Sequence, residues 1–448
     1  MRGSILRKYF KTILWACSIL QISSVGTTAA ETMTLADGIS LALERNEQVL
    51  ISQVEQERAQ HSLREARSGG LPQINASIDY NRNWLLPSLV FNGNSVKIGS
   101  ENTIAATLSM RQSLYTGGRN GALRTLAQQE QEAVRQAYRQ ARHNIIYEVE
   151  KAFYDVLVAR ELEEVSVIAL QSARANQSQV EARRQAGRSS QYDVLRAEVQ
   201  VSTTAADSIR SQNERLLAEM AFRAVIGLDL GSDVEFVGDF RQNSVLDLDE
   251  LGPLMDEALL NRPELLQLNY RRGQQEAQVS LEKSGQRPEL SLVASAQSQF
   301  QSDRLDLTDR EWRKNWATGF LLQVPLFDGR RANARVAQAK ASTRQVELEW
   351  QRVERMVRLD VEQNWLRWRE VNARMGAQED AVRQAEKGLQ MAESLFKTGA
   401  GTQLEVLNAQ LALVQSRTGL ALARRDRSMS LVSLEKAVGV LSDVGSSK

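Results

Sequence analysis

Long stretches without proline or glycine constrain this chain more than any other feature of its sequence. No proline occurs between Ser88 and Gly252 or from Leu326 onward, and no glycine occurs from Ala122 to Ala186. This last stretch is rich in Ala, Gln, Glu, Arg and Leu, which favour helices. At about 1.5 Å per residue it predicts a single helix about 100 Å long, far beyond a normal globular helix.

The apolar residues inside these stretches are spaced as in a coiled coil. Steps of three and four residues separate the members of two groups. The first group is Ile146, Val149, Phe153 and Val156, and the second is Leu404, Leu407, Leu411 and Val414. A helix with such a stripe must pack lengthwise against another helix, because the stripe would otherwise stay in contact with water.

The same landmarks occur twice along the chain. Residues 114–119 match residues 326–331 at an offset of 212. The same offset relates four further pairs: Gly187 and Gly399, residues 193–195 and 405–407, Ala197 and Ala409, and Gly227 and Gly439. Upstream the offset becomes 216, where Pro72 pairs with Pro288. Ordered matches of this kind indicate an internal duplication.

Each copy is predicted to contain a helix, a pair of strands, a very long helix, a tight turn and another long helix. We expect the first repeat over residues 31–227, with its strands in 72–115 and its turn near residue 187. The second repeat is expected over residues 252–440, with its strands in 288–327 and its turn near residue 399. Residues 228–251 link the two repeats in the equatorial region, and residues 441–448 form a C-terminal tail.

The first thirty residues have the features of a secretory signal peptide. Four basic side chains precede an apolar run from Ile13 to Val25, and the segment ends in Thr28, Ala29 and Ala30. The run is too short for a membrane-spanning helix, which needs about 20 apolar residues. We therefore expect cleavage after Ala30 and export of the remaining chain.

The composition of the exported chain argues against several kinds of site. Without residues 1–30 it has 52 basic and 55 acidic side chains, and this net charge of about −3 does not suggest a nucleic-acid partner. The only cysteine, Cys17, lies in the signal peptide, so neither a disulfide nor a cysteine metal site is expected. His61 and His143 lie in polar helical sequence, which indicates surface histidines. We therefore predict no metal and no cofactor.

Both predicted strand pairs have one apolar and one polar face. The apolar faces contain Ile74, Ala76, Ile78, Tyr80, Ile104, Ala106, Leu108 and Met110 in the first repeat, and Leu290, Leu292, Ala294, Ala296, Trp316, Phe320, Leu322 and Val324 in the second. Polar residues such as Asn75, Ser77 and Ser291 alternate with them. Strands of ten or more residues with this alternation are long enough to span a membrane when tilted.

Two interpretations of these strands compete. They could be surface hairpins on a soluble helical bundle, or they could span a membrane as part of a β-barrel. Both repeats carry strands at the same place, and Trp84, Trp312 and Trp316 lie near strand ends, where an aromatic belt would lie. The membrane interpretation is therefore favoured. Open sheet edges are not tolerated in lipid, so four strands per chain need further chains, and three copies would supply twelve strands around a lumen.

Taken together, these features resemble the TolC-type outer-membrane efflux channels. The likeness is carried by the signal peptide, the duplication, the strand-to-helix motifs at residues 114–119 and 324–330, and the paired turns that begin at Gly187 and Gly399. It covers essentially the whole exported chain. The resemblance implies a mixed α and β fold, with very long coiled-coil helices and four transmembrane strands per chain.

The same resemblance implies a homotrimer in the outer membrane of a Gram-negative bacterium. Its twelve-stranded barrel would stand in outer-membrane lipid, and its α-helical tunnel would cross much of the periplasm. The partners implied are a periplasmic adaptor (membrane fusion) protein and an inner-membrane transporter of the RND, ABC or MFS type. Such a duct conducts passively and hydrolyses nothing, so the chain is not expected to be an enzyme.

The two matched turns would form the tip of the tunnel, at the end farthest from the strands. Gly187 and Gly399 fit the left-handed position that ends a helix, and Ser190 and Thr402 are well placed to cap the next one. These motifs therefore predict tight helical hairpins. The resemblance adds a second role for the tip, which is docking of the adaptor.

Family members narrow their periplasmic entrance with side chains next to this turn. The matching residues are Asp193, Phe396, Glu405 and Asn408. Three copies of Glu405 would form an acidic ring that attracts cations and repels anions. Two positions depart from the family pattern: Asn408 is neutral where a second acidic ring is found, and Gly401 stands where some members carry a locking arginine.

The sequence contains no catalytic constellation such as a nucleophile elbow, a phosphate loop or a zinc motif. Glycines at 117, 118 and 329 lack nucleotide-site spacing and predict a bend from strand into helix. The favoured function is an exit duct for drug or metabolite efflux. The alternatives are the same duct in type I protein secretion, and a periplasmic coiled-coil scaffold without a pore, which would be soluble and would not conduct.

Overall fold

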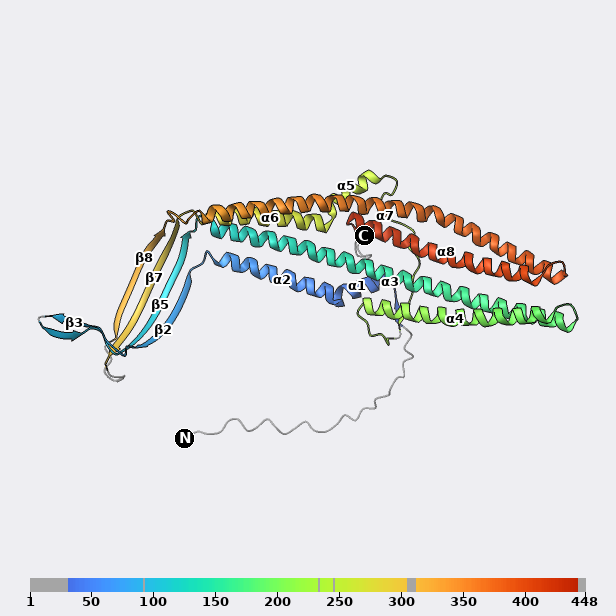
Figure 1. The fold of residues 1–448 in the computed structure, drawn as a ribbon, viewed down its shortest axis with the longest axis horizontal. Coiled ribbons are helices and arrows are strands. Elements are labelled where there is room, and N and C mark those ends of the chain that lie inside the picture. Colours follow the sequence, from blue (N-terminus) through green and yellow to red (C-terminus); the bar gives the residue numbers. More distant parts are fainter. Residues whose placement is uncertain (1–30, 92, 233, 245, 304–311, 442–448) are drawn as a thin grey trace, which may run out of the picture.

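The computed structural model describes residues 31–91, 93–232, 234–244, 246–303 and 312–441. They form an elongated protomer with a β-sheet at one end and long helices that run from it to a distant tip (Figure 1). The expected signal peptide, residues 1–30, lies outside the described residues, as does most of the expected tail. No helix in the described part of the chain is both long enough and apolar enough to cross a membrane.

The first repeat contains two short helices, two long strands and two long helices. Their bounds are α1 Leu35–Arg45, α2 Glu47–Ser68, β2 Gln73–Arg82, β5 Asn102–Tyr115, α3 Arg119–Gln185 and α4 Gln191–Val225. Between β2 and β5 a two-stranded ribbon, β3 Ser88–Phe91 and β4 Asn94–Lys97, extends beyond the sheet (Figure 1).

The second repeat reproduces this order. Its elements are α5 Leu251–Asn261, α6 Pro263–Ser284, β7 Glu289–Ser302, β8 Arg313–Gln323, α7 Arg331–Thr398 and α8 Gln403–Val438. The starts of α5 and α6 are related to those of α1 and α2 by the upstream offset of the sequence repeat, and the starts of α7 and α8 are related to those of α3 and α4 by the main offset. The predicted very long helices are confirmed, since α3 has 67 residues and α7 has 68.

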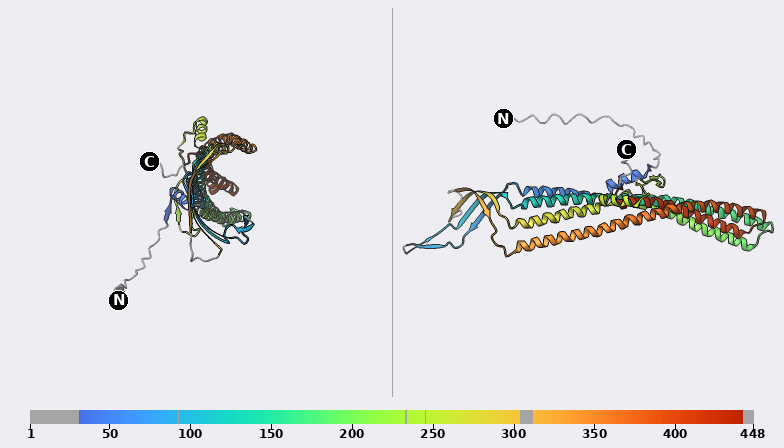
Figure 2. Two further views of the ribbon diagram at one scale, coloured as in Figure 1. Left: turned by 90° about the vertical axis from the view of Figure 1, so that its left-hand side faces the viewer. Right: turned by 90° about the horizontal axis from the view of Figure 1, so that it is seen from above.

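The four long strands form one antiparallel sheet in the order β2-β5-β7-β8. Pairing of β5 with β7 joins the two repeats, and β2 and β8 are left as the edges. The register aligns apolar residues in rows across the sheet, and one such row is Ala76, Leu108, Ala296 and Trp316. The predicted division into an apolar and a polar face therefore holds across both repeats. Seen end-on, the sheet and helices form a curved layer (Figure 2).

Glycines turn the chain from strand into helix at both junctions, as predicted. Gly117 and Gly118 have φ angles of +61° and +96°, and Gly329 has a φ of +69°. A Cβ at Gly117 would lie 2.6 Å from Cβ of Arg287, so this position also needs glycine for space. Arg330 is the residue paired with Gly118 by the repeat, and it adopts a φ of +66° without being a glycine.

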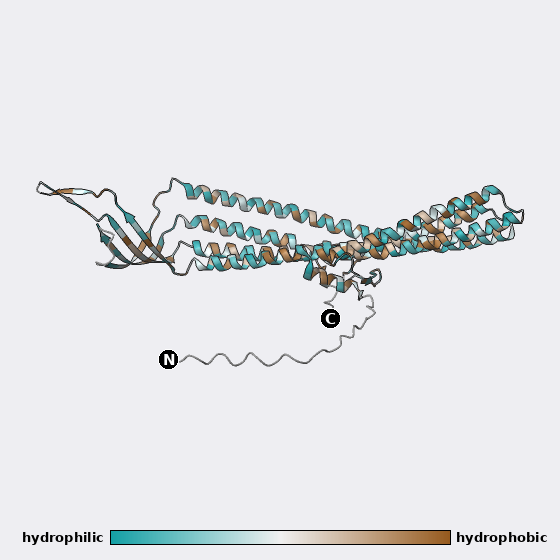
Figure 3. Ribbon diagram, turned by 90° about the horizontal axis from the view of Figure 1, so that it is seen from below, coloured by the Kyte–Doolittle hydropathy of each residue, from teal (hydrophilic) through white to brown (hydrophobic). Residues whose placement is uncertain are grey.

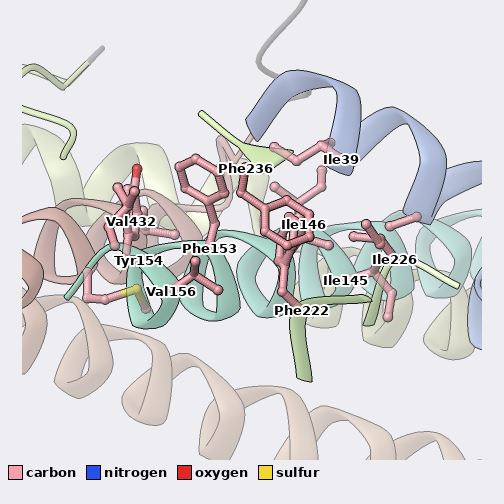
Figure 4. Packing of buried hydrophobic residues seen from close by; sticks show 14 of the residues in the cluster. Ile39, Ile145, Ile146, Phe153, Tyr154, Val156, Phe222, Ile226, Phe236 and Val432 are labelled. Atoms are coloured by element: carbon pink, nitrogen blue, oxygen red, sulfur yellow. The ribbon is translucent and has the colours of Figure 1, made fainter. Parts of the chain in front are cut away.

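The main apolar core lies at the waist of the protomer, halfway along the helices (Figure 3), and Figure 4 shows its packing from close by. Phe222 of α4 packs between Phe153 of α3 and Phe236 of the short strand β6 Val234–Phe236, with ring centroids 5.6 and 4.8 Å apart. Ile39 of α1 joins the same cluster. Strand β6 pairs in parallel with β1 Glu31–Met33, a contact that the sequence did not predict.

One prediction about a single residue is wrong, and one apolar stripe is only partly buried. His143 is only 9% exposed and therefore is not a surface histidine. The first coiled-coil group, which starts at Ile146, is buried as predicted, but in the second group Leu404 and Leu411 remain 48% and 54% exposed. Helix α8 instead buries a face that includes Gln403, Val406 and Gln410 against its own protomer. Leu407 and Val414 are half-buried, so the leucine stripe is only partly covered in a single copy of the chain.

Candidate site at the helical tip

The first tip turn connects α3 to α4 through residues 186–190. The amide of Arg188 donates to the carbonyl of Arg183 (2.8 Å), and Gly187 takes a φ of +72°, so the end of α3 is closed by a glycine as predicted. Ser190 caps α4. Its hydroxyl accepts from the amide of Asp193 (3.1 Å), and its own amide donates back to Oδ2 of Asp193 (2.9 Å).

The second turn repeats this geometry between α7 and α8. The amide of Ala400 donates to the carbonyl of Leu395 (3.0 Å), and Gly399 has a φ of +85°. Thr402 caps α8 by accepting from the amide of Glu405 (3.3 Å), and its amide donates to Oε2 of Glu405 (2.8 Å). Every one of these contacts is related to its counterpart in the first turn by the main offset of the sequence repeat.

A small core holds the two turns together within one protomer. Val180, Val194, Phe396 and Val406 form this tip core, and each comes from a different helix. The guanidinium of Arg183 lies 4.1 Å from the ring centroid of Phe396, and its Nη2 donates to the Phe396 carbonyl. Arg183 therefore fastens the end of α3 to the end of α7.

A second link joins the starts of α4 and α8. Nε2 of Gln403, a buried side chain, donates to the carbonyl of Asp193 (3.1 Å). Because this bond connects the first turns of the two helices, it brings the Asp193 and Glu405 capping boxes onto the same end of the protomer. Both helix N-termini carry partial positive charge, which favours acidic side chains in the first turn.

The four residues predicted for the aperture lie in different surroundings. Glu405 and Asn408 are exposed on α8, and Asp193 is partly exposed on α4. Hydrogen bonds from the Ser190 hydroxyl and amide lower the pKa of the Asp193 carboxyl below its usual value, so the residue stays ionised. Phe396 is only 4% exposed and packs inside the tip core.

The backbone at Gly401 explains why a bulkier residue is absent there. A Cβ at this position would lie 3.0 Å from Cβ of Leu395 and 3.1 Å from Oε2 of Glu405. An arginine like that of some family members would therefore need the turn to shift. In this chain Arg183 and Gln403 link the two helical hairpins. The sequence repeat did not reveal Arg183, because the residue paired with it is Leu395.

Above the tip, a cavity of about 440 Å³ opens between the two helical hairpins. Apolar residues of α3 and α8 line part of it, including Leu162, Val165, Leu411 and Val414. Leu411 and Val414, two members of the leucine stripe of α8, thus border a space that the protomer itself does not fill.

Long paired helices project from a small antiparallel sheet and end in two capped turns, each with one acidic capping partner, Asp193 or Glu405. A family model described as "Outer membrane efflux protein" matches residues 38–228 and 254–440. The chain belongs to this family. It is an outer-membrane channel protein of efflux systems in Gram-negative bacteria, it extends into the periplasm, and it transports without catalysing a reaction.

Individual relatives agree with this assignment. The outer membrane protein TolC of Vibrio cholerae is 26% identical over 91% of this chain and 91% of its own length. The outer membrane efflux protein BepC of Brucella suis is 24% identical over 96% of this chain and 91% of its own. The crystal structure of the Campylobacter jejuni CmeC outer membrane channel shares the fold, with a TM-score of 0.78 at 17% identity over 90% of this chain and 85% of that one.

Proposed function

We propose that three copies of this chain form the exit duct of a tripartite efflux system. Their sheets would close into a twelve-stranded barrel in the outer membrane, and their helices would form a periplasmic tunnel that conducts drugs or metabolites passively. A periplasmic adaptor and an inner-membrane transporter of the RND, ABC or MFS type would deliver the solute. We favour efflux over type I protein secretion because the names of several relatives refer to efflux.

The duplication supports a closed ring of copies. Within one protomer, α3 of the first repeat packs against α6 of the second, and Oε1 of Gln140 accepts from Nε2 of Gln267 (2.8 Å) across this seam. The repeat relates α3 to α7 and α6 to α2. If the same seam recurs between copies, α7 of one chain packs against α2 of the next. Ile51 and Arg352 are then the counterparts of Gln267 and Gln140.

Exposed apolar residues on these edge helices support the same arrangement. Ile51 and Val54 of α2 are 53% and 62% exposed, and Leu348, Leu359 and Leu366 of α7 are each more than half exposed. Burial of such stripes is the main favourable term in the association of helices. The sheet edges β2 and β8 are also unpaired in one copy, and pairing them between copies would leave no edge in lipid.

Disulfide crosslinking tests the ring directly. Residues 31–448 contain no cysteine, so introduced thiols report only designed contacts. We expect the double variant Ile51→Cys/Arg352→Cys to crosslink between copies and to give covalent species up to the trimer. The matched variant Gln140→Cys/Gln267→Cys should crosslink within one chain. The seam is rejected if the first variant gives no intermolecular bands under conditions in which the matched variant forms its disulfide.

The tip is proposed as both the entrance and the docking surface. Asp193, Glu405 and Asn408 would face the aperture, with Phe396 holding the turn behind them. Gly187, Ser190, Gly399 and Thr402 shape the turns that an adaptor would contact. In this duct each chain contributes two repeats, residues 31–227 and 252–440, and the linker of residues 228–251 joins them in the equatorial region.

Conductance and export measurements test the duct itself. The purified protein should give steady single-channel conductance in a planar bilayer and should remain a heat-resistant oligomer in detergent. Deletion of the gene should raise the accumulation of a fluorescent efflux dye and leave exported protein unchanged. Conductance without any effect on dye, together with loss of a secreted protein, would instead assign the duct to type I secretion.

A further inference from the structure

A segment of the inter-repeat linker, residues 237–250 without residue 245, is bound to three of the long helices. We call it the strap. The ring of Phe240 stacks on Tyr154 of α3 with centroids 6.1 Å apart. The Ser428 hydroxyl on α8 donates to the carbonyl of Arg241 (3.0 Å), and Nε1 of Trp365 on α7 donates to the carbonyl of Leu248 (3.0 Å). The strap therefore spans α3, α8 and α7 at the waist.

Beneath the strap, two buried carboxyl groups share one guanidinium. Nη2 of Arg241 lies 2.7 Å from Oε1 of Glu435, and its Nη1 lies 4.0 Å from Oε2 of Glu150. Glu150 is fully buried and Glu435 is 2% exposed. The Ser244 hydroxyl, also on the strap, donates to Oε1 of Glu435 (3.0 Å). With both carboxyls ionised, the side chains of Arg241, Glu150 and Glu435 together carry two negative charges and one positive charge.

The hydrogen bonds of Glu150 do not compensate a full charge. Tyr154 donates to Oε2 (3.3 Å), while Oε1 has no hydrogen-bond partner among the described residues. A buried carboxylate oxygen without a donor is costly, and binding of one proton removes the excess charge and lowers that cost, because a neutral carboxyl group is easier to bury than a carboxylate. The charged or titratable groups that act on Glu150 are Tyr154 on its own helix, Arg241 on the strap and Glu435 on α8.

We propose that Glu150 is a proton-operated latch for the strap. With a proton on Glu150 the site is neutral, and Arg241 holds the strap on α3 and α8. Loss of that proton leaves a second buried carboxylate, which Arg241 does not fully compensate and which gains hydration when the strap lifts, so the contacts of the strap with both helices loosen. This inference concerns the coupling of the two repeats and does not depend on what the channel exports.

The balance of local forces agrees with a switch near neutral pH. Burial raises the pKa of Glu150 to about 7, Arg241 opposes this shift, and the like charge of Glu435 adds to it. The residue paired with Glu150 by the repeat is Glu362, an exposed carboxylate on α7. Glu362 therefore offers a control of identical chemistry outside the buried site.

Two measurements on the detergent-purified full chain test the latch. Infrared difference spectra should show a protonated carboxyl band that disappears as the pH rises from about 6 to about 8.5. Hydrogen exchange of the strap amides, corrected for intrinsic rates, should become roughly tenfold faster over the same range. In Glu150→Gln the band should be absent and the strap should stay protected at every pH, whereas Glu362→Gln should behave as wild type.

A second variant keeps the test independent of how well Glu150→Gln folds. In Glu435→Gln, the guanidinium of Arg241 is left to Glu150 alone, so the infrared band should disappear at lower pH than in wild type. The latch is rejected if no titrating band depends on Glu150 or Glu435. It is equally rejected if strap exchange is independent of pH while the band titrates.

Discussion

The Asp193 and Glu405 carboxylates each serve as part of a helix cap and as surface charge. Each accepts a hydrogen bond from the backbone amide of its capping residue, Ser190 or Thr402, and each still lies at the narrow end of the protomer. Because an exposed negative charge at a helix N-terminus is stabilised by the helix dipole, these two carboxylates cost the fold little. Substitutions at these residues must therefore separate the loss of a cap from the loss of a charge.

Arg183 should control how firmly the tip is closed within a protomer. A cation–π contact and a hydrogen bond together contribute on the order of 1–2 kcal/mol. We expect Arg183→Ala to raise amide exchange at residues 395–400 roughly tenfold and to increase leak conductance. Arg183→Lys should be intermediate, because lysine keeps the charge without the planar stacking group. Arg184→Ala alters the exposed neighbour, and an equal effect there would refute a specific role for Arg183.

The heat resistance of the protein should fall as the pH rises through neutrality. The folded-state pKa of Glu150, about 7, lies above its ordinary value of 4.5, so the folded protein holds an extra proton between these values. This contribution to stability is fully present below the ordinary pKa and is lost as the pH rises through about 7. Thermal unfolding followed by circular dichroism at several pH values should show this decline. A decline of the same size in Glu150→Gln would assign it to other groups.

At the level of helices and strands, breaker residues and periodicity predicted most of the architecture. The long helices contain no proline and few glycines, and the strands largely alternate between apolar and polar residues, so local sequence determines both. The β1–β6 pair has only three residues per strand, which is too short for a periodic signal. The spacing of the leucine stripe of α8 identifies an apolar face, but spacing does not identify the partner of that face. Arg183 was missed for a related reason, since a contact between helices far apart in sequence leaves no local pattern.

The tip glycines should matter through backbone conformation alone. Gly187 and Gly399 have positive φ angles, and a Cβ at either position would meet nothing within 4 Å. We expect Gly187→Ala and Gly399→Ala each to destabilise the hairpin by about 1 kcal/mol. Gly388→Ala is the matched control, because Gly388 lies inside α7 with equally open space, and alanine there should stabilise by roughly 0.5–1 kcal/mol. Thermal midpoints that move in the same direction for all three variants would contradict this explanation.

For the whole molecule, a single protomer leaves its most apolar surfaces and its sheet edges open. The waist core and the tip core hold the two repeats together, whereas α2, α7, β2 and β8 end in unpaired faces. The duplication builds one such seam, between α3 and α6, inside each chain, while apolar residues on the counterpart helices α2 and α7 stay exposed in one copy. Family membership as a channel also removes the scaffold without a pore from consideration.

Charge selectivity at the proposed aperture can be separated from its mechanical closure. Glu405→Gln removes the charge but keeps a side chain that can complete the capping box, so cation preference should fall while leak stays near wild type. Glu405→Ala removes both, and leak should rise as well. Asn408→Asp adds an exposed carboxylate one turn further along α8 and should increase cation preference. Reversal potentials in a salt gradient measure the preference, and conductance at low voltage measures the leak. If none of the three variants changes the reversal potential, the start of α8 does not line the narrowest part of the pore.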